Sequence, residues 1–487
     1  MELNTKIISF ISGLNWGNAL TNLPVQVIEF YGTKTGTNTE DEAIISTLEV
    51  ALCVGAAFGT ILTPIYVQKL GFTNSLIILF GLQMLFSGLT MVPVHWIYLT
   101  VIRTITGLVT SSISSLTPLL VAEVLSPKER GHTMMNFAIA LNLGIVLAYV
   151  IHLLTSFNYE FWMLNFAFPV VCGFVALFCL RKIYVKQKEM RKISLKEQRN
   201  DLLEQENQMD AIQHSDEMIS ATFIKSSAEE TSNTFARRVQ TSSPDQFNKK
   251  LTKTQFKRVV YITVALGMMQ MFTGADAIII YASDIFESLF KSEKSGIYAS
   301  LIIGVVNLVY TLIAVPIAEK QKRRNILMTG VIGVSICHVI IAALYFFHCN
   351  KLYVLAALLL LFFFYNIGPE PIVFMLFSEM FPQKYKVKLN GLGYTVNWIS
   401  NIISVFIFQF FQNGKEHFVY LLFGLLTITL GVSGTILAPE TFEKTLMDIE
   451  IQIRAWTKKS ERKVRREGLE MKVVVMNLQN QQIQVKE

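Results

Sequence analysis

The sequence predicts an all-α membrane protein with twelve transmembrane helices in two six-helix halves joined by a cytoplasmic linker. Hydrophobic residues make up 52% of the 487 residues and charged residues only 16%, whereas an ordinary soluble chain carries about 25% charged residues. Long apolar runs alternate with short polar loops, and one polar stretch, 183–257, separates two groups of six runs. The same composition excludes a soluble globule, a collagen-like or disordered chain and a disulfide scaffold.

Each apolar run is long enough to cross a bilayer as a helix, which takes about 20 mainly apolar residues. The runs are 6–30, 45–67, 75–94, 96–121, 132–154, 160–181, 258–285, 296–318, 326–347, 352–377, 388–412 and 417–438. The first is interpreted as a spanning helix and not as a signal peptide, because no small-residue cleavage site follows it.

These runs divide the chain into four parts. We expect an N-terminal six-helix bundle at 1–182, a linker at 183–257, a C-terminal six-helix bundle at 258–438 and a basic tail at 439–487. In the linker, 186–213 favours a helix. The Ser- and Thr-rich stretch 215–243 is typical of a loosely ordered chain.

The distribution of positive charge predicts the orientation. The net charge is +7, and Lys and Arg gather in the linker, in the tail and in the short loops on one side of the predicted helices. Cytoplasmic loops carry this excess, so both termini and the linker are expected in the cytoplasm. The plasma membrane is the expected membrane. The charge therefore indicates membrane orientation and contact with lipid, and no nucleic-acid partner is expected.

No catalytic or cofactor pattern is recognisable. Ser-His-Asp, H-E-x-x-H, P-loop and G-x-G-x-x-G arrangements are absent, so we expect neither an enzyme nor a nucleotide partner nor any cofactor. The 5 cysteines are irregularly spaced and form no C-x-x-C pair, which favours free thiols and no metal site.

The two halves carry a matching motif. Glu123 after the fourth run and Glu379 after the tenth are each followed seven residues later by a base, Arg130 and Lys386, with a proline between them. Paired motifs at matching positions indicate an internal repeat in parallel orientation.

Six short motifs in the right order give the chain a family resemblance. They are 23–29, 118–123 with Arg130 and Gly131, 270–281, 368–369 with 378–382, 397–401 and 439–441. The chain resembles the sugar porter branch of the major facilitator superfamily, most closely the facilitative glucose transporters. It departs from the family pattern at 68–73, which lacks two of the usual cations, and at Lys322, which replaces a glycine.

The resemblance implies a sugar site built from amides and aromatic rings. Such groups match a ring of hydroxyls with an apolar face. Gln270, Asn307, Asn397 and Trp398 fall at the family's sugar-binding positions. The alternative is that the amides only join helices to each other.

Two further positions depart from the family in residue type. Phe374 falls where the family usually has Trp, and Tyr149 where its fifth helix usually offers Gln. Ordinary packing is the alternative for Phe374.

Two carboxylates are unusual for the family. Asp276 replaces an Asn of the seventh helix, and Glu370 replaces a Gly, whereas the family's own acid falls at the position of Asn366. Residues four apart share a helix face, so we expect the acid to have moved one turn along the same wall. The alternative for Glu370 is a hydrogen bond to backbone freed by the neighbouring prolines.

A last group of residues is expected to control access. In proton-coupled relatives the Arg equivalent to Arg103 faces an Asp of the first helix. Here that helix offers Asn15, Asn18 and Asn22 and no acid before Glu29, so a structural link from Arg103 to amides or carbonyls is the alternative. The expected gating residues are Arg103, Glu123, Arg130, Tyr281, Glu319, Arg323, Arg324, Glu379 and Lys386. For the charged residues at the cytoplasmic face, ordinary surface charge is the alternative.

The resemblance implies transport of a monosaccharide, such as the hexose glucose, by alternating access. Facilitated diffusion is favoured because the first helix lacks the proton-carrying acid. Proton symport through Asp276 or Glu370 is the second reading. A non-transporting sugar sensor is the third, and the short basic tail disfavours it.

Overall fold

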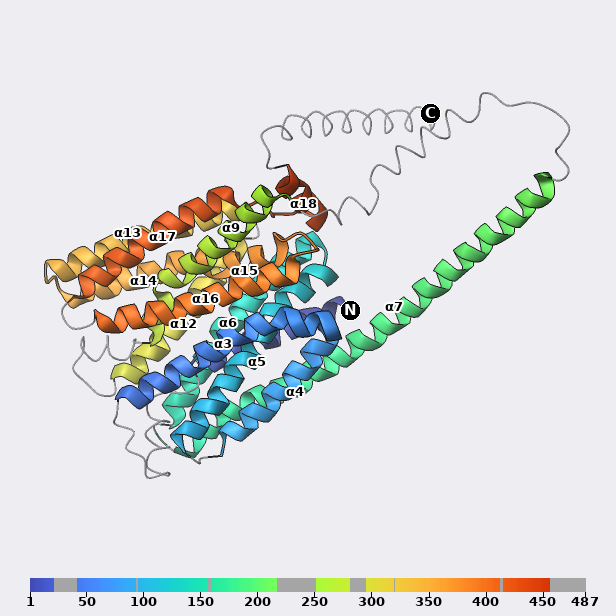
Figure 1. Ribbon diagram of the computed structural model, residues 1–487. Coiled ribbons are helices and arrows are strands. Elements are labelled where there is room, and N and C mark those ends of the chain that lie inside the picture. The colour runs from blue at the N-terminus through green and yellow to red at the C-terminus, as the bar shows by residue number, and fades with distance from the viewer. Residues whose placement is uncertain are drawn as a thin grey trace, which may run out of the picture.

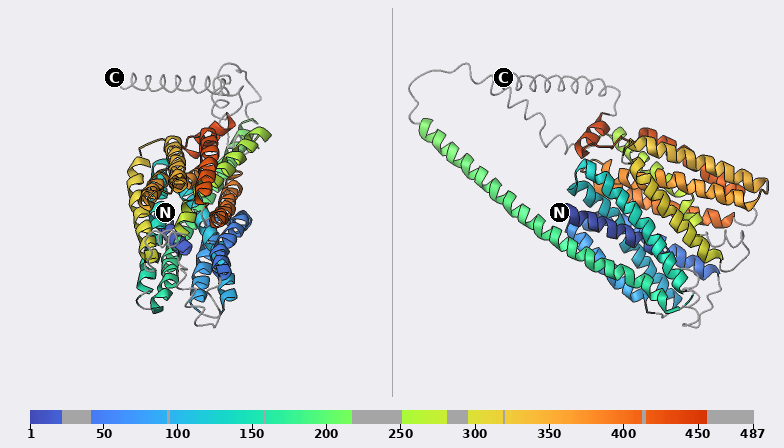
Figure 2. Two further views of the ribbon diagram at one scale, coloured as in Figure 1. Left: turned by 90° about the vertical axis from the view of Figure 1, so that its left-hand side faces the viewer. Right: turned by 180° about the vertical axis from the view of Figure 1, so that it is seen from behind.

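The computed structural model describes residues 1–21, 42–92, 95–155, 157, 159–216, 251–280, 295–318, 320–411 and 415–455. Within these ranges every regular element is a helix, which confirms the predicted all-α membrane fold. The helices form two bundles that lie side by side (Figure 1), and the end-on view separates them clearly (Figure 2).

The first bundle contains the helices up to α7. They are α1 (Glu2–Thr21), α3 (Glu42–Leu70), α4 (Phe72–Thr90), α5 (Trp96–Val124), α6 (Pro127–Thr155), the 3-10 helix η1 (Tyr159–Met163) and α7 (Leu164–Asp216). We call this bundle the N half.

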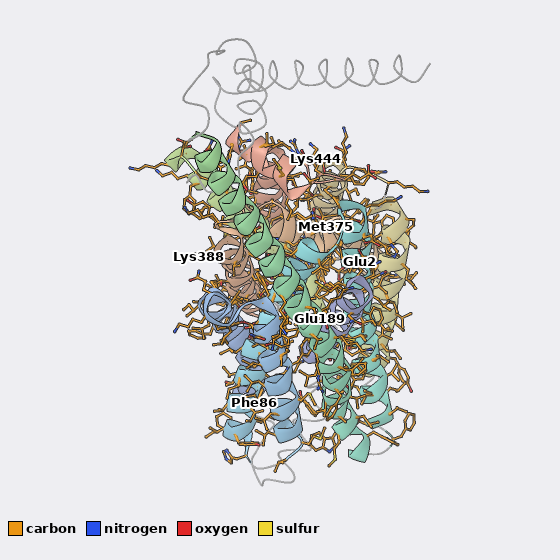
Figure 3. All side chains as sticks on the ribbon, turned by 90° about the vertical axis from the view of Figure 1, so that its right-hand side faces the viewer. Glu2, Phe86, Glu189, Met375, Lys388 and Lys444 are labelled. Carbon is orange, nitrogen blue, oxygen red and sulfur yellow. The ribbon has the colours of Figure 1, made fainter. Side chains whose placement is uncertain are left out.

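The second bundle, the C half, contains the remaining helices. They are α9 (Lys253–Phe272), α10 (Ala275–Ile280), α12 (Ser295–Ala318), α13 (Arg323–Phe346), α14 (Lys351–Ile367), α15 (Pro369–Glu379), α16 (Lys386–Phe410), α17 (Glu416–Leu437) and α18 (Leu446–Arg454). Figure 3 shows the two halves as layers, with Lys444, Met375 and Lys388 in one and Glu189 and Phe86 in the other.

Eleven helical stretches of the described chain are long and apolar enough to cross a membrane. They coincide with the last eleven predicted runs. The first predicted run is described only as far as Thr21, where it forms α1. Large apolar side chains such as Phe174, Phe178, Ile336 and Val339 are exposed on the outer surface. Water would disfavour such a surface, so lipid is the solvent that fits it.

Helix α7 is continuous from the sixth predicted span into the linker, and it projects far beyond the bundles (Figure 1). The first part of α7 packs along α4. One contact between them is the hydrogen bond that the Thr73 hydroxyl donates to the Gln187 side-chain oxygen at 2.8 Å. The helix covers the stretch 186–213 that the sequence favours as helical. We call the end of the bundles from which α7 projects the linker end.

Two predicted spans are broken where the sequence suggests single helices. The seventh breaks between α9 and α10 at Gly274, whose φ of +68° is a conformation that favours glycine. The backbone carbonyls freed at the break have side-chain partners. The Thr427 hydroxyl donates to Phe272 O at 3.0 Å, and the His338 Nε2 atom lies 2.9 Å from Thr273 O. The tenth breaks at Gly368, and Pro369 begins the new helix α15.

Glycines allow close helix packing in the N half, and Gly55 is one example. Helices α3 and α5 approach so tightly at Gly55 that a Cβ atom there would lie 1.8 Å from the backbone oxygen of Thr104. Small residues allow such approaches in membrane bundles, where dispersion contacts replace the hydrophobic effect as the force between helices.

We therefore predict that Gly55→Ala destabilises the protein by about 1–3 kcal/mol, since the new methyl group must push two backbones apart. The thermal unfolding midpoint in detergent measures the effect. Gly81→Ala in α4 is the matched control, because no atom lies within 4 Å of a Cβ built there. Equal midpoints for the two variants would contradict the close packing of α3 on α5.

Candidate functional site

A buried hydrogen bond joins the two halves at the centre of the molecule. The Asn142 amide of α6 donates to Glu370 Oε1 of α15 at 2.8 Å and to the Thr311 hydroxyl of α12 at 3.0 Å. All three side chains are buried. Asn142 therefore ties one helix of the N half to two helices of the C half.

The polar chain continues into the C half through two amides that the sequence singles out. The Thr311 hydroxyl donates to Asn366 Oδ1 at 2.7 Å, and the Asn366 amide donates to Asn307 Oδ1 at 2.7 Å. Asn307 and Asn366 thus lie within one hydrogen-bonded chain that ends at Glu370. The helix is interrupted at Gly368, between Asn366 and Glu370, so the two residues do not belong to one continuous helix. Thr311 and Asn142 connect their side chains across the break.

A second group of amides lies beside the first. The Asn397 amide of α16 donates to Gln270 Oε1 of α9 at 3.0 Å, and the Gln270 amide donates to the backbone oxygen of Glu370 at 3.3 Å. Gln270 therefore links Asn397 of α16 to the start of α15.

Asp276 at the start of α10 belongs to the same region. It accepts a hydrogen bond from the Asn401 amide at 2.9 Å and one from the Tyr365 hydroxyl. Asn401 in turn accepts from the Cys53 thiol of α3 at 3.4 Å, so this group also reaches the N half. The Tyr365 hydroxyl has both Asp276 and Glu370 as electrostatic neighbours.

Aromatic rings fill the space between the halves. Trp16 of α1 has its ring centroid 5.0 Å from that of Phe374, 6.1 Å from that of Trp398 and 5.8 Å from that of Phe137. Phe374 stacks on Tyr394 at 5.1 Å. Trp16 is only 4% exposed. The rings thus form one aromatic cluster that contacts both halves.

A small cavity adjoins this cluster. Its lining comes from both halves and consists of Met134, Phe137, Ala138, Leu141, Glu370, Pro371 and Phe374. Three buried polar atoms of the cluster and the cavity lining have no hydrogen-bond partner among the described residues: Trp16 Nε1, Trp398 Nε1 and Glu370 Oε2. Buried polar groups are normally satisfied, so these atoms are available to a polar ligand.

Sequence reasoning missed three contributors to this centre. Asn142 is an amide in the middle of an apolar run, which is the signal that identifies it. Trp16 reads as an ordinary apolar residue of the first helix, and Thr311 as a helix-compatible hydroxyl. Tyr149, which the sequence places in the site, lies two turns further along α6. Its ring packs beside Gly304 of α12 and against His152.

Arg103 bonds to backbone in its own half. Its Nε atom donates to the carbonyl oxygen of Leu48 in α3 at 2.9 Å, and the side chain is buried. This contact agrees with the alternative interpretation of Arg103 as a structural link to carbonyls.

Charged side chains meet across the halves at the linker end. We call Glu123, Arg130, Arg323, Glu379 and Lys386 the linker-end cluster. Glu379 has Arg323, Arg130 and Lys386 as electrostatic neighbours, and Lys386 also neighbours Glu123. Since Glu123 and Arg130 belong to the N half and the others to the C half, the cluster attracts the two halves to each other.

Arg324 serves a different purpose from that cluster. Its guanidinium donates to the backbone oxygens of Thr435 at 3.1 Å and Ile436 at 2.7 Å, at the end of α17. Glu440 accepts from the backbone N–H groups of Arg323 and Arg324 at 3.1 and 3.3 Å. A carboxylate is favourable at a helix N-terminus, so these contacts tie α13 to α17 inside the C half.

Several sequence predictions lie outside the described residues. They are the expected gating residues Tyr281 and Glu319, the motif at 23–29, Asn22, the part of the stretch 215–243 from 217 onward, and the part of the tail from 456 onward.

Comparison with known proteins identifies the family of this chain. Residues 5–452 match the model of a family described as "Sugar (and other) transporter". The mouse "Solute carrier family 2, facilitated glucose transporter member 2" is 26% identical over 72% of this chain and 66% of that protein. The "Glucose facilitated diffusion protein" of Zymomonas mobilis is 24% identical over 72% of this chain and 73% of its own.

A solved structure shares the fold. It is the major facilitator superfamily proton:xylose symporter XylE bound to 6-bromo-6-deoxy-D-glucose, with a TM-score of 0.71 at 19% identity over 92% of this chain and 98% of its own. The fold of the chain is therefore that of the major facilitator superfamily.

We predict that Glu379→Gln loosens the linker end, because Arg130, Arg323 and Lys386 then repel one another without a central anion. A cysteine introduced at Ser115, in a chain freed of its other cysteines, should react several-fold faster with an impermeant thiol reagent applied from the linker side. Glu129→Gln is the control, since the partner of Glu129 is Lys6 of the same half at 2.9 Å. Identical labelling rates in both variants would argue against gating by Glu379.

Proposed function

Because the chain belongs to the family of sugar (and other) transporters, we propose that it carries a monosaccharide, a hexose such as glucose, across the membrane by facilitated diffusion. The observation that carries this proposal is the central group of amides and aromatic rings between two helix bundles. Gln270, Asn397 and Asn142 offer both donors and acceptors, as sugar hydroxyls require. Trp16 and Phe374 offer apolar ring faces.

Alternating access follows from how the two halves meet. The linker-end cluster holds one end closed by attraction between Arg130 of the N half and Glu379 of the C half. Rocking of one half against the other around a central site separates these charges and opens that end. The helix breaks at Gly274 and Gly368 lie beside the site. During such a motion, α10 and α15 can tilt relative to α9 and α14 without bending a continuous helix.

The expected setting is a plasma membrane with both termini and the linker in the cytoplasm, so that the linker end faces the cytoplasm. Lipid surrounds the exposed apolar side chains. The sequence holds no nucleotide motif, and a sugar gradient is the expected driving force.

A second candidate function is proton-coupled sugar symport. It is favoured by the two buried acids Glu370 and Asp276, which share Tyr365 as a neighbour, and by the likeness in fold to a structure named as a proton:xylose symporter. It is disfavoured by the described part of α1, whose one acid is Glu2 at the start of the helix, far along the chain from Asn15 and Asn18.

We predict that Gln270→Ala weakens sugar binding by about 1–3 kcal/mol, or roughly 5- to 150-fold, because sugar hydroxyls lose a buried partner. Binding to the purified protein, measured calorimetrically or by ligand-induced thermal stabilisation, gives the number. Gln83→Ala removes another buried amide, on α4, which packs on α5 and α7 of the same half. Unchanged affinity in Gln270→Ala, with Gln83→Ala behaving alike, would exclude Gln270 from the site.

Uptake into proteoliposomes tests the function itself. We expect labelled hexose to equilibrate down its gradient and not to accumulate when a pH gradient of either sign is imposed. Accumulation driven by an inward proton gradient, and abolished by Asp276→Asn or Glu370→Gln, would establish symport instead. Saturable binding without any uptake would favour a sugar sensor.

A further inference from the structure

The centre of the site holds a carboxylate that a neutral sugar does not require. The Glu370 side chain is only 5% exposed, and one of its oxygens, Oε1, accepts the Asn142 amide. The other oxygen, Oε2, has no hydrogen-bond partner among the described residues, and Glu370 lines the central cavity. Glu370 thus presents an unsatisfied acceptor at the place where a substrate sits.

A second carboxylate reinforces the negative character of this region. Asp276 is an electrostatic neighbour of Glu370. Among the described residues, the cations beside α15 lie at its opposite end, where Arg130, Arg323 and Lys386 neighbour Glu379. A ligand that brings its own positive charge would therefore find complementary charge at the centre.

The free-energy cost of burying the Glu370 carboxylate also favours a positively charged ligand. A buried, ionised carboxylate without a counter-charge is costly, and a buried ion pair is favourable only when further hydrogen bonds complete it. Asn142 already supplies such a bond on Oε1. A ligand ammonium group that donates to Oε2 would complete the pair.

The aromatic cluster also suits a cation. Phe137 and Phe374 line the same cavity as Glu370, and the ring centroid of Trp16 lies 5.8 Å from that of Phe137 and 5.0 Å from that of Phe374. Faces of aromatic rings attract an organic ammonium group through the ring quadrupole. A carboxylate beside several rings therefore has the chemistry that suits a protonated amine.

We propose that the central site prefers a monosaccharide that carries a protonated amine, a 2-amino-2-deoxyhexose, over the corresponding neutral hexose. The proposal rests on the proposed function as a sugar transporter. The ammonium group donates to Glu370 Oε2, and the remaining hydroxyls contact Gln270, Asn397 and the indole N–H of Trp398. The apolar face of the sugar ring packs on Phe374.

Competition for uptake tests the preference. Proteoliposomes containing the full chain take up labelled glucose in the presence of unlabelled glucosamine, glucose or N-acetylglucosamine at about pH 6, where an amine of this type is protonated. We expect glucosamine to inhibit at a concentration about tenfold lower than glucose, since charge-assisted hydrogen bonds are roughly twice as strong as neutral ones. N-acetylglucosamine, which has the bulk but no charge, should show no such advantage.

Two further measurements assign the preference to the carboxylate. In Glu370→Gln the ratio of the glucose and glucosamine inhibitory concentrations should fall to near one, while Glu129→Gln, which alters an acid paired with Lys6 in the N half, should keep the wild-type ratio. In the wild-type protein the advantage of glucosamine should decline at about pH 9, where the amine is neutral. This second readout needs no variant and holds even if Glu370→Gln folds poorly.

The outcomes separate this inference from the proposed function. Glucose uptake without any advantage of glucosamine, an equal advantage of N-acetylglucosamine, or an advantage that persists in Glu370→Gln would overturn the amine proposal and leave sugar transport intact. Failure of the wild-type protein to take up either labelled glucose or labelled glucosamine would overturn the proposed function instead.

Discussion

The hydrogen bond from Asn142 to Glu370 is the contact on which the centre of this molecule depends. Lipid offers no hydrogen bonds to replace those made inside a membrane bundle, so a buried amide and a buried carboxyl must find partners within the protein or in a ligand. Separating the halves breaks this bond at 2.8 Å, so Glu370 Oε1 loses its donor while Asn142 keeps only its acceptor within α6, the backbone oxygen of Ala138 at 3.2 Å. An unsatisfied buried group costs about 1–3 kcal/mol. A bound sugar can offset that cost because its hydroxyls replace the lost partners.

The two broken helices explain how acids come to lie at this centre. Glu370 occurs in the first turn of α15 and Asp276 in the first turn of α10, each directly after a break. Pro369, at the first position of α15, lacks the N–H that a continuous helix would require and fixes the new start. The N-terminal dipole of α15 stabilises negative charge on Glu370. Each break thus interrupts a span and also supplies the local environment that a buried carboxylate needs.

The sequence predicts the spans well because hydropathy alone determines which segments enter lipid. It predicts a site role for Gln270, Asn307 and Asn397 because they fall at positions of the family resemblance, whereas Asn142, an equally unusual amide in an apolar run, matches none of the six family motifs and is missed. It does not predict that Trp16 lies against Phe374, since that contact joins the first helix to the tenth and depends on how the two bundles meet. The break at Gly274 is hidden for a related reason: a glycine inside an apolar run has no visible effect until tertiary neighbours such as His338 and Thr427 take up the freed carbonyls.

Helix α15 connects the centre with the linker end. It begins next to Glu370, which bonds across the halves through Asn142, and it ends at Glu379, which attracts Arg130 of the N half. Its eleven residues form a rod of about 15 Å, and Phe374 in its middle packs on Trp16. Under the proposed function, a ligand that moves α15 as a rigid body at Glu370 also shifts Glu379 relative to its cations. The proposed sugar contact and the proposed gating contact then act through the same short helix.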